Sequence, residues 1–338
     1  MSTKKHAHFV PLWGFSGPLA QTIGGFYWPR PADVRPTSNH RLALRDGDRL
    51  MLHESRPHSW QAGDPMVLLI HGMAGSWQSS YMIRLCRRFW ERGVLVVRMN
   101  QRGSGPGFGL ARKPGHCGRS DDVRQVVAWM EKRHPASPQG IIGISMGGNL
   151  SLKMCGEAGN NAPEHWRALV AVSPPIDIQA TVSYLRRSLF RHLNWYFTFR
   201  LYNDLRKLSQ LYPEIIVPKL QRWTLEEFDR RYTVPQCGFV STADYYRSAS
   251  SKSVLTQITV PTLILMALDD PIVYPEDFRE VAVSPSTEVI LTEKGGHVGF
   301  LGQNHRGSSS GERQRWMDTL IVEWVLKRLW RDGARGQT

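Results

Sequence analysis

The order of apolar segments predicts an α/β fold with a mainly parallel central sheet, helices on both faces and a helical insertion. Three observations support this prediction. Short apolar runs alternate with amphipathic segments, as they do in parallel sheets covered by helices. One of these runs leads into the pentapeptide Gly143-Ile144-Ser145-Met146-Gly147. Between residues 176 and 250 the alternation stops, and aromatic, helix-like sequence replaces it.

The expected elements follow from apolar periodicity along the chain. Arg41–Arg45 and Arg49–His53 flank Asp46-Gly47-Asp48, which indicates a hairpin near the start. Buried strands are predicted over residues 66–70, 93–99, 140–144, 167–172, 262–267 and 288–291. Helices are predicted over residues 78–91, from Ser120 or Asp121 onward, over 146–155 and over 311–331.

These elements divide the chain into three parts. Residues 1–38 are rich in proline and glycine and are expected to form an extended arm packed on the core. Residues 39–175 and 251–338 form that core. Residues 176–250 are an insertion, expected to be a helical cap because ligands of open α/β sheets bind at the carboxyl ends of strands. The alternative is that these helices only pack on the core.

Composition limits the class of protein. The chain has 338 residues, 41% of them apolar, and no 18-residue apolar run that would predict a membrane span. Four widely spaced cysteines indicate free thiols in a reducing compartment, and hence a cytoplasmic protein. The net charge is +14. No nucleic-acid-binding module is apparent, so nucleic acid is not an expected partner. The charge indicates either peripheral contact with an anionic membrane or simply a basic surface.

The pentapeptide around Ser145 matches the G-x-S-x-G pattern of a nucleophile elbow. In such an elbow a strand turns sharply into a helix and exposes the serine oxygen. Glycines two residues before and two after the serine let strand and helix pack closely. The alternative is an ordinary strand-to-helix turn, since glycine and serine are common residues.

A serine nucleophile needs a base and an acid that orients the base. In this fold class the chain order is serine, acid, histidine. His297 follows the last predicted strand within Gly295-Gly296-His297-Val298-Gly299-Phe300 and is the predicted base. Asp269 and Asp270 both follow the strand over 262–267. Asp270, followed by Pro271-Ile272-Val273, is the preferred acid, and Asp269 would then brace the loop.

An oxyanion hole needs two backbone N–H donors. Met146 follows the nucleophile and supplies one. The loop after the strand over 66–70 supplies the other at Met73. His71 precedes the serine in the chain, so it is expected to support this loop rather than act as a base. The segment 102–107 resembles a phosphate-binding loop only loosely, because it lacks the Gly-Lys-Ser/Thr ending, and is expected to be a structural turn.

With these residues identified, the chain resembles the YheT-like branch of the α/β-hydrolases, the AB hydrolase 4 family, over residues 15 to 302. The resemblance rests on motifs spread along the chain. They are Leu19-Ala20-Gln21-Thr22-Ile23, His71-Gly72-Met73-Ala74-Gly75-Ser76, Met99-Asn100-Gln101-Arg102-Gly103-Ser104-Gly105, Ser145-Met146-Gly147-Gly148-Asn149-Leu150, Asp244-Tyr245-Tyr246-Arg247-Ser248-Ala249-Ser250, Asp269-Asp270-Pro271 and Gly295-Gly296-His297-Val298-Gly299-Phe300.

The resemblance implies the α/β-hydrolase fold, a triad of Ser145, Asp270 and His297, and ester or lipid-ester substrates. The expected activity is hydrolysis of carboxylic esters through an acyl-enzyme, without metal or organic cofactor. Two alternatives stay open. The same triad could transfer the acyl group to an alcohol, or the fold could be catalytically silent and bind lipid or another molecule. No oligomeric state is predicted.

Overall fold

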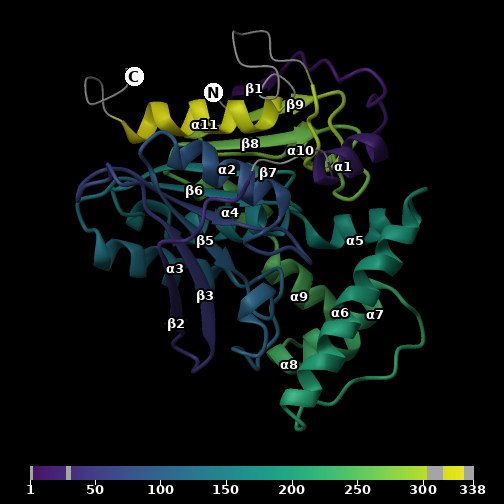
Figure 1. Ribbon diagram of the computed structural model, residues 1–338. Helices are drawn as coiled ribbons and strands as arrows, with labels where there is room; N and C mark the ends of the chain where they lie inside the picture. The colour runs from purple at the N-terminus through teal and green to yellow at the C-terminus, as the bar shows by residue number, and fades with distance from the viewer. Residues whose placement is uncertain (1–2, 28–31, 303–314, 331–338) are drawn as a thin grey trace.

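A nine-stranded sheet forms the centre of the molecule (Figure 1). The computed structural model describes residues 3–27, 32–302 and 315–330. The strand order is β1-β9-β8-β7-β6-β4-β5-β3-β2. The strands are β1 (Thr3–His6), β2 (Ser38–Ala43), β3 (Arg49–Ser55), β4 (Met66–Ile70), β5 (Leu95–Asn100), β6 (Gln139–Ile144), β7 (Trp166–Val172), β8 (Thr262–Ala267) and β9 (Thr287–Thr292).

In this spatial order, every neighbouring pair from β1 through β9, β8, β7, β6 and β4 to β5 is parallel. The β5–β3 and β3–β2 pairs are antiparallel. This confirms the predicted mainly parallel sheet and the hairpin. The strands predicted over 66–70 and 262–267 have the same bounds in the structure. The strand predicted over 93–99 begins later, at Leu95, because Gly93 occupies a left-handed turn at φ 75°.

Helices cover both faces of the sheet, as predicted. On one face α2 and α11 pack on Val67 and Leu69, and on the other α3 and α4 pack on Leu68 and Ile70. The alternation follows from strand geometry, since successive side chains point to opposite faces. The helices are α1 (Pro18–Tyr27), α2 (Ser80–Trp90), α3 (Ser120–Arg133), α4 (Met146–Ala158), α5 (Ile178–Arg187), α6 (Arg191–Leu211), α7 (Leu225–Phe228), α8 (Val234–Cys237), α9 (Thr242–Ala249), α10 (Asp277–Glu280) and α11 (Trp316–Leu329).

Helix α11 matches the predicted last helix, although the first part of that prediction, from residue 311, lies outside the described residues. The insertion over residues 176–250 contains α5 to α9 and lies to one side of the sheet in Figure 1. Across the described residues, no helix combines the length and the apolar character that a membrane span requires.

The expectation of an extended N-terminal arm is wrong in two places. Thr3–His6 form β1, which pairs in parallel with β9 at the edge of the sheet. Pro18–Tyr27 form α1. Neither element has a clear apolar period. The strand is polar and is aligned by its neighbour, and the helix contains Gly24 and Gly25, which lower intrinsic helix propensity.

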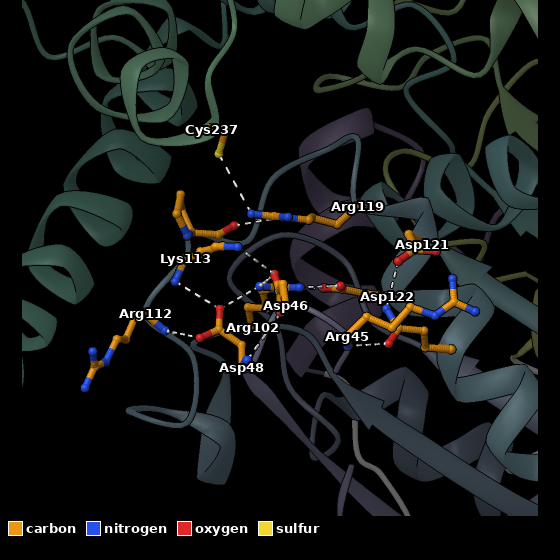
Figure 2. Close-up of polar contacts among 12 residues, drawn as sticks. Arg45, Asp46, Asp48, Arg102, Arg112, Lys113, Arg119, Asp121, Asp122 and Cys237 are labelled. Atoms are coloured by element: carbon orange, nitrogen blue, oxygen red, sulfur yellow. Dashed lines mark hydrogen bonds and ion pairs between the residues drawn. The ribbon is translucent and has the colours of Figure 1, made fainter. Parts of the chain in front are cut away.

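The segment 102–107 is a structural turn in which Arg102 joins three parts of the core (Figure 2). Its guanidinium binds both carboxylate oxygens of Asp122 at 2.6 and 2.7 Å, and also binds Asp46 at 2.8 Å and Asp48 at 2.6 Å. Burial alone would lower the pKa of Arg102, but hydrogen bonds and charge from Asp122 and Asp46 outweigh it and raise that pKa. The cluster ties the β2–β3 turn to the start of α3.

Candidate active site

Ser145 lies in a tight turn between β6 and α4, with φ 53° and ψ −119°. Non-glycine residues rarely adopt this conformation. The glycines of the motif allow the turn because neighbouring backbone passes close to them. A Cβ on Gly143 would lie 2.3 Å from the carbonyl oxygen of Gly147, and a Cβ on Gly147 would lie 2.5 Å from that of Ile70. This is the geometry of a nucleophile elbow, and it leaves Ser145 half-buried.

The loops that follow β8 and β9 bring Asp270 and His297 together. Asp270 Oδ2 lies 2.8 Å from His297 Nδ1. Asp270 is fully buried, and its Oδ1 accepts hydrogen bonds from the backbone N–H of Ile272 at 2.8 Å and of Val273 at 2.9 Å. These two bonds orient Oδ2 toward the imidazole. An ionised Asp270 selects the tautomer with hydrogen on Nδ1, which leaves Nε2 free to accept a proton.

Asp269 lies in the same loop but contacts backbone rather than imidazole. Its Oδ1 accepts a hydrogen bond from the Gly296 N–H at 2.8 Å. Burial raises the pKa of Asp269; the Gly296 hydrogen bond opposes that rise, and the nearby Asp270 charge adds to it. The structure therefore places Asp270, and not Asp269, against His297.

The loop after β4 passes directly over the serine. A Cβ on Gly72 would lie 3.0 Å from the Ser145 Cβ. Among the described residues none accepts a hydrogen bond from the Met73 N–H, so this donor is available to a ligand. Met146 is the first residue of α4, where the amide N–H has no helical acceptor. Met73, Met146 and Ser145 line one cavity.

His71 supports the loop after β4 through hydrogen bonds. It is fully buried, and burial lowers its pKa to about 4 although a hydrogen bond to Gly72 opposes the shift. Its Nε2 accepts from the Gln101 N–H at 3.1 Å, so its Nδ1 carries the hydrogen and donates to the Gly72 carbonyl at 2.7 Å. This neutral imidazole, with hydrogen-bond partners at both ring nitrogens, supports the loop, as the sequence predicts. Tyr81 also holds the loop, because its hydroxyl accepts from the Gly72 N–H at 3.0 Å; no sequence pattern pointed to Tyr81.

The cavity that contains Ser145 and His297 has a volume of about 360 Å³ and lies between α1, α5 and α6. Apolar side chains from the insertion form much of its wall: Ile178, Val182, Leu185, Leu193, Tyr196 and Phe197. Helix α1 contributes Thr22, Ile23 and Phe26 to the other wall. From its sequence this N-terminal segment is expected only to pack on the core, and no motif in it indicates a place at the site.

A model of the family described as serine aminopeptidase, S33 (Hydrolase_4) matches residues 61–298, a span that includes Ser145, Asp270 and His297. The chain belongs to this family of α/β-hydrolases. The hydrolase is also 30% identical to a protein of Escherichia coli (strain K12) named "Putative esterase YheT", with 94% of this chain and 93% of that protein covered. The resemblance to the YheT-like branch is therefore confirmed.

More distant relatives and solved structures are also α/β-hydrolases or enzymes named for ester chemistry. The hydrolase is 28% identical to "Phospholipase ABHD3" of Mus musculus, with 70% of this chain covered, and spans 58% of that protein's length. It is 24% identical to "Medium-chain fatty acid ethyl ester synthase/esterase 2" of Saccharomyces cerevisiae, covering 89% and 67% of the two chains. The solved esterase Pf2001 of Pyrococcus furiosus superposes with a TM-score of 0.58 at 17% identity, covering 89% and 97% of the chains. That likeness confirms the predicted fold.

Proposed function

We propose that this hydrolase cleaves carboxylic esters, lipid esters included, through an acyl-enzyme formed on Ser145. The observation that carries the proposal is the 2.8 Å contact between Asp270 and His297 beside the strained Ser145, within one cavity. Among the described residues Ser145 Oγ makes no hydrogen bond, so its contact with the His297 Nε2 belongs to the proposal. Such contacts often tighten only when substrate binds.

In the proposed mechanism His297 Nε2 takes the proton of Ser145 Oγ as that oxygen attacks the ester carbonyl. The Met73 and Met146 N–H groups stabilise the negative oxygen of the tetrahedral intermediate. The intermediate collapses, the C–O bond to the alcohol breaks, and His297 gives its proton to the departing alkoxide. Water then repeats the sequence on the acyl-enzyme and releases the acid. Asp270 stabilises the imidazolium in both halves.

The substrate class is supported by the cavity and by the relatives. The cavity wall contributed by the insertion is mainly apolar, with Thr181 and Arg200 as its polar members, which suits an acyl chain. We propose that residues 176–250 act as a cap that covers Ser145 and holds this chain. Curated relatives are named as esterases and as a phospholipase, which supports an ester or lipid-ester substrate.

Acyl transfer to an alcohol is a second candidate, because the yeast relative is named as an ethyl ester synthase as well as an esterase. Both reactions share the acyl-enzyme and differ only in what attacks it. Adding ethanol to an assay with a p-nitrophenyl ester distinguishes them. A synthase forms ethyl ester in excess of the amount that the ethanol-to-water ratio gives, whereas a plain hydrolase forms mainly acid.

The experiment that tests the proposed function is labelling with a fluorophosphonate probe. Wild type is expected to label, and Ser145→Ala is expected to lose both labelling and ester turnover while keeping its circular dichroism spectrum. Ser151→Ala is a matched control, because Ser151 is a buried serine in α4, the helix that follows Ser145, and its hydroxyl only donates to the Gly147 carbonyl. An unlabelled wild type would favour a silent binding protein, and labelling retained in Ser145→Ala would exclude Ser145 as nucleophile.

We further propose that the insertion contacts anionic membrane surfaces peripherally. Between Thr181 and Arg231 ten residues are basic and five are acidic. Three of the ten, Arg186, Arg230 and Arg231, pair with Glu226 or Glu227. The other seven have no ion pair within the described residues: Arg187, Arg191, Arg200, Arg206, Lys207, Lys219 and Arg222. These cations of the insertion, of which Arg200 lines the cavity, would attract an anionic surface.

A further inference from the structure

The loop that carries His297 has an unusual backbone. Gly296 has φ 58°, Val298 has φ 62° and Phe300 has φ 42°. Left-handed conformations are uncommon for non-glycine residues, and a β-branched valine there is an outlier. Such a backbone persists only where its surroundings determine it. The contacts that impose this conformation therefore also set the position of His297.

Helix α1 supplies many of those contacts. Thr22 Oγ1 accepts a hydrogen bond from the His297 N–H at 2.9 Å and donates one to the Pro18 carbonyl at 2.7 Å. A second pair of hydrogen bonds reaches Leu301, the residue that follows Phe300. The fully buried Gln21 donates from Nε2 to the Leu301 carbonyl at 2.9 Å and accepts at Oε1 from the Leu301 N–H at 2.7 Å. Adjacent residues of α1 thus hold the loop at the histidine and four residues later.

The helix and the loop also touch through backbone. A Cβ on Gly299 would lie 2.3 Å from the Gln21 carbonyl oxygen, and a Cβ on Gly296 would lie 2.5 Å from that of Pro18. A Cβ on Gly25 would lie 2.6 Å from the Gly299 Cα. No side chain fits between the two segments at these points, so any displacement of α1 is passed directly to the loop.

We propose that Thr22 is a positioning residue for His297, a role that rests on the proposed function of the triad. His297 is held at two points, its N–H by the Thr22 hydroxyl and its Nδ1 by Asp270. Without the first bond, the backbone of His297 itself loses its hydrogen bond to α1 and can shift locally, although Gln21 and the close backbone contacts still hold the rest of the loop. Both acylation and deacylation pass a proton through Nε2, so misplacement lowers kcat and leaves KM nearly unchanged.

Two substitutions isolate the hydroxyl. Thr22→Val keeps the shape of the side chain and removes the acceptor, whereas Thr22→Ser keeps the acceptor. Thr37→Val is the matched control. Thr37 Oγ1 accepts from the Arg56 N–H at 3.2 Å and donates to the Glu54 carbonyl at 3.1 Å, the same pair of bonds as at Thr22, but it does not line the catalytic cavity.

The readout is kcat per active site, with sites counted from fluorophosphonate labelling at saturation. A loss of folded protein reduces the number of sites, whereas misplacement of His297 reduces the rate at each site. Thr22→Val is expected to lower kcat per site about 10- to 100-fold with KM within about twofold. Thr22→Ser should restore most of that loss, and Thr37→Val should match wild type.

The inference is overturned if Thr22→Val retains the wild-type kcat per site. It is also overturned if Thr22→Val loses its titratable sites together with its thermal transition, because Thr22 would then serve folding alone. A wild type that does not label would instead contradict the proposed triad, so the two failures are distinguishable.

Discussion

Two neighbouring carboxylates, Asp269 and Asp270, follow β8, and their surroundings separate them. Asp270 is fully buried, accepts two backbone N–H bonds and faces His297. Asp269 accepts from the Gly296 N–H, and its Oδ2 is buried without a partner among the described residues. Only the first arrangement can hold an imidazole in one tautomer and stabilise its cation.

Asp270→Asn is expected to lower kcat/KM for a p-nitrophenyl ester about 10³- to 10⁴-fold, because an amide can donate to Nδ1 and select the wrong tautomer. Asp269→Asn serves as the neighbouring control and should cost less than about tenfold, since its amide oxygen can still accept from Gly296. Steady-state kinetics on both purified variants make the comparison. A larger loss in Asp269→Asn would reverse the two roles.

Local motifs in the sequence singled out the candidate triad, whose catalytic role stays a prediction. Ser145, Asp270 and His297 lie in short patterns at strand ends, and the structure brings Asp270 and His297 into contact beside Ser145. Tyr81 and Thr22 carry no such pattern. Their roles depend on which backbone N–H donates a hydrogen bond to each hydroxyl, and for Thr22 that N–H belongs to a residue 275 positions away in the chain.

At the scale of elements, apolar periodicity predicted the buried strands, because burial on both faces leaves a continuous apolar run, and it predicted the helices α2, α3, α4 and α11. It failed for β1 and α1, whose stability comes from neighbours rather than from their own pattern. Strand β1 is the polar segment Thr3–His6 aligned against β9, with Lys5 paired to Glu288 at 2.8 Å. Tertiary contacts of this kind leave no periodic signal in the sequence.

The Arg102 cluster allows a stability prediction for the elements that it joins. Arg102→Met should lower the free energy of unfolding by about 3–5 kcal/mol, because it leaves Asp122 and Asp48 buried without their cation. Arg247→Ala removes a pair whose arginine is 80% exposed and should cost no more than about 1 kcal/mol. Urea unfolding followed by circular dichroism measures both. Equal losses of unfolding free energy in the two variants would show that the Arg102 cluster does not stabilise the contact between the β2–β3 turn and α3.

At the scale of the whole molecule, the net charge of +14 is spread along the chain, and the insertion adds to it with ten basic and five acidic residues between Thr181 and Arg231. Exposed charges act on a partner within about 10 Å at 0.1 M salt. On the proposed membrane contact, we expect an anionic bilayer to bind at low ionic strength and to be released as salt is added. Whether the arginines of the insertion carry this attraction or merely solvate its surface is decided by substitution.

Wild type is expected to co-sediment with vesicles containing anionic phospholipid at low salt and to dissociate at high salt. The double variant Arg187→Glu/Arg191→Glu should lose most of this binding. The matched control Lys132→Glu/Arg133→Glu changes net charge equally at exposed sites near the end of α3, outside the insertion, and should retain it. Equal losses in both double variants would mean that total charge governs binding. Absent or salt-independent binding of wild type would remove the membrane proposal.

The contact between α1 and the His297 loop also has a consequence for biosynthesis. The ribosome adds His297 275 residues after Thr22. At 5–20 residues per second, that interval is about 15 to 55 s. Throughout this interval α1 lacks its partner loop, and His297, the proposed base, is not yet part of the chain. The proposed triad can therefore be completed only after the two remote segments have met.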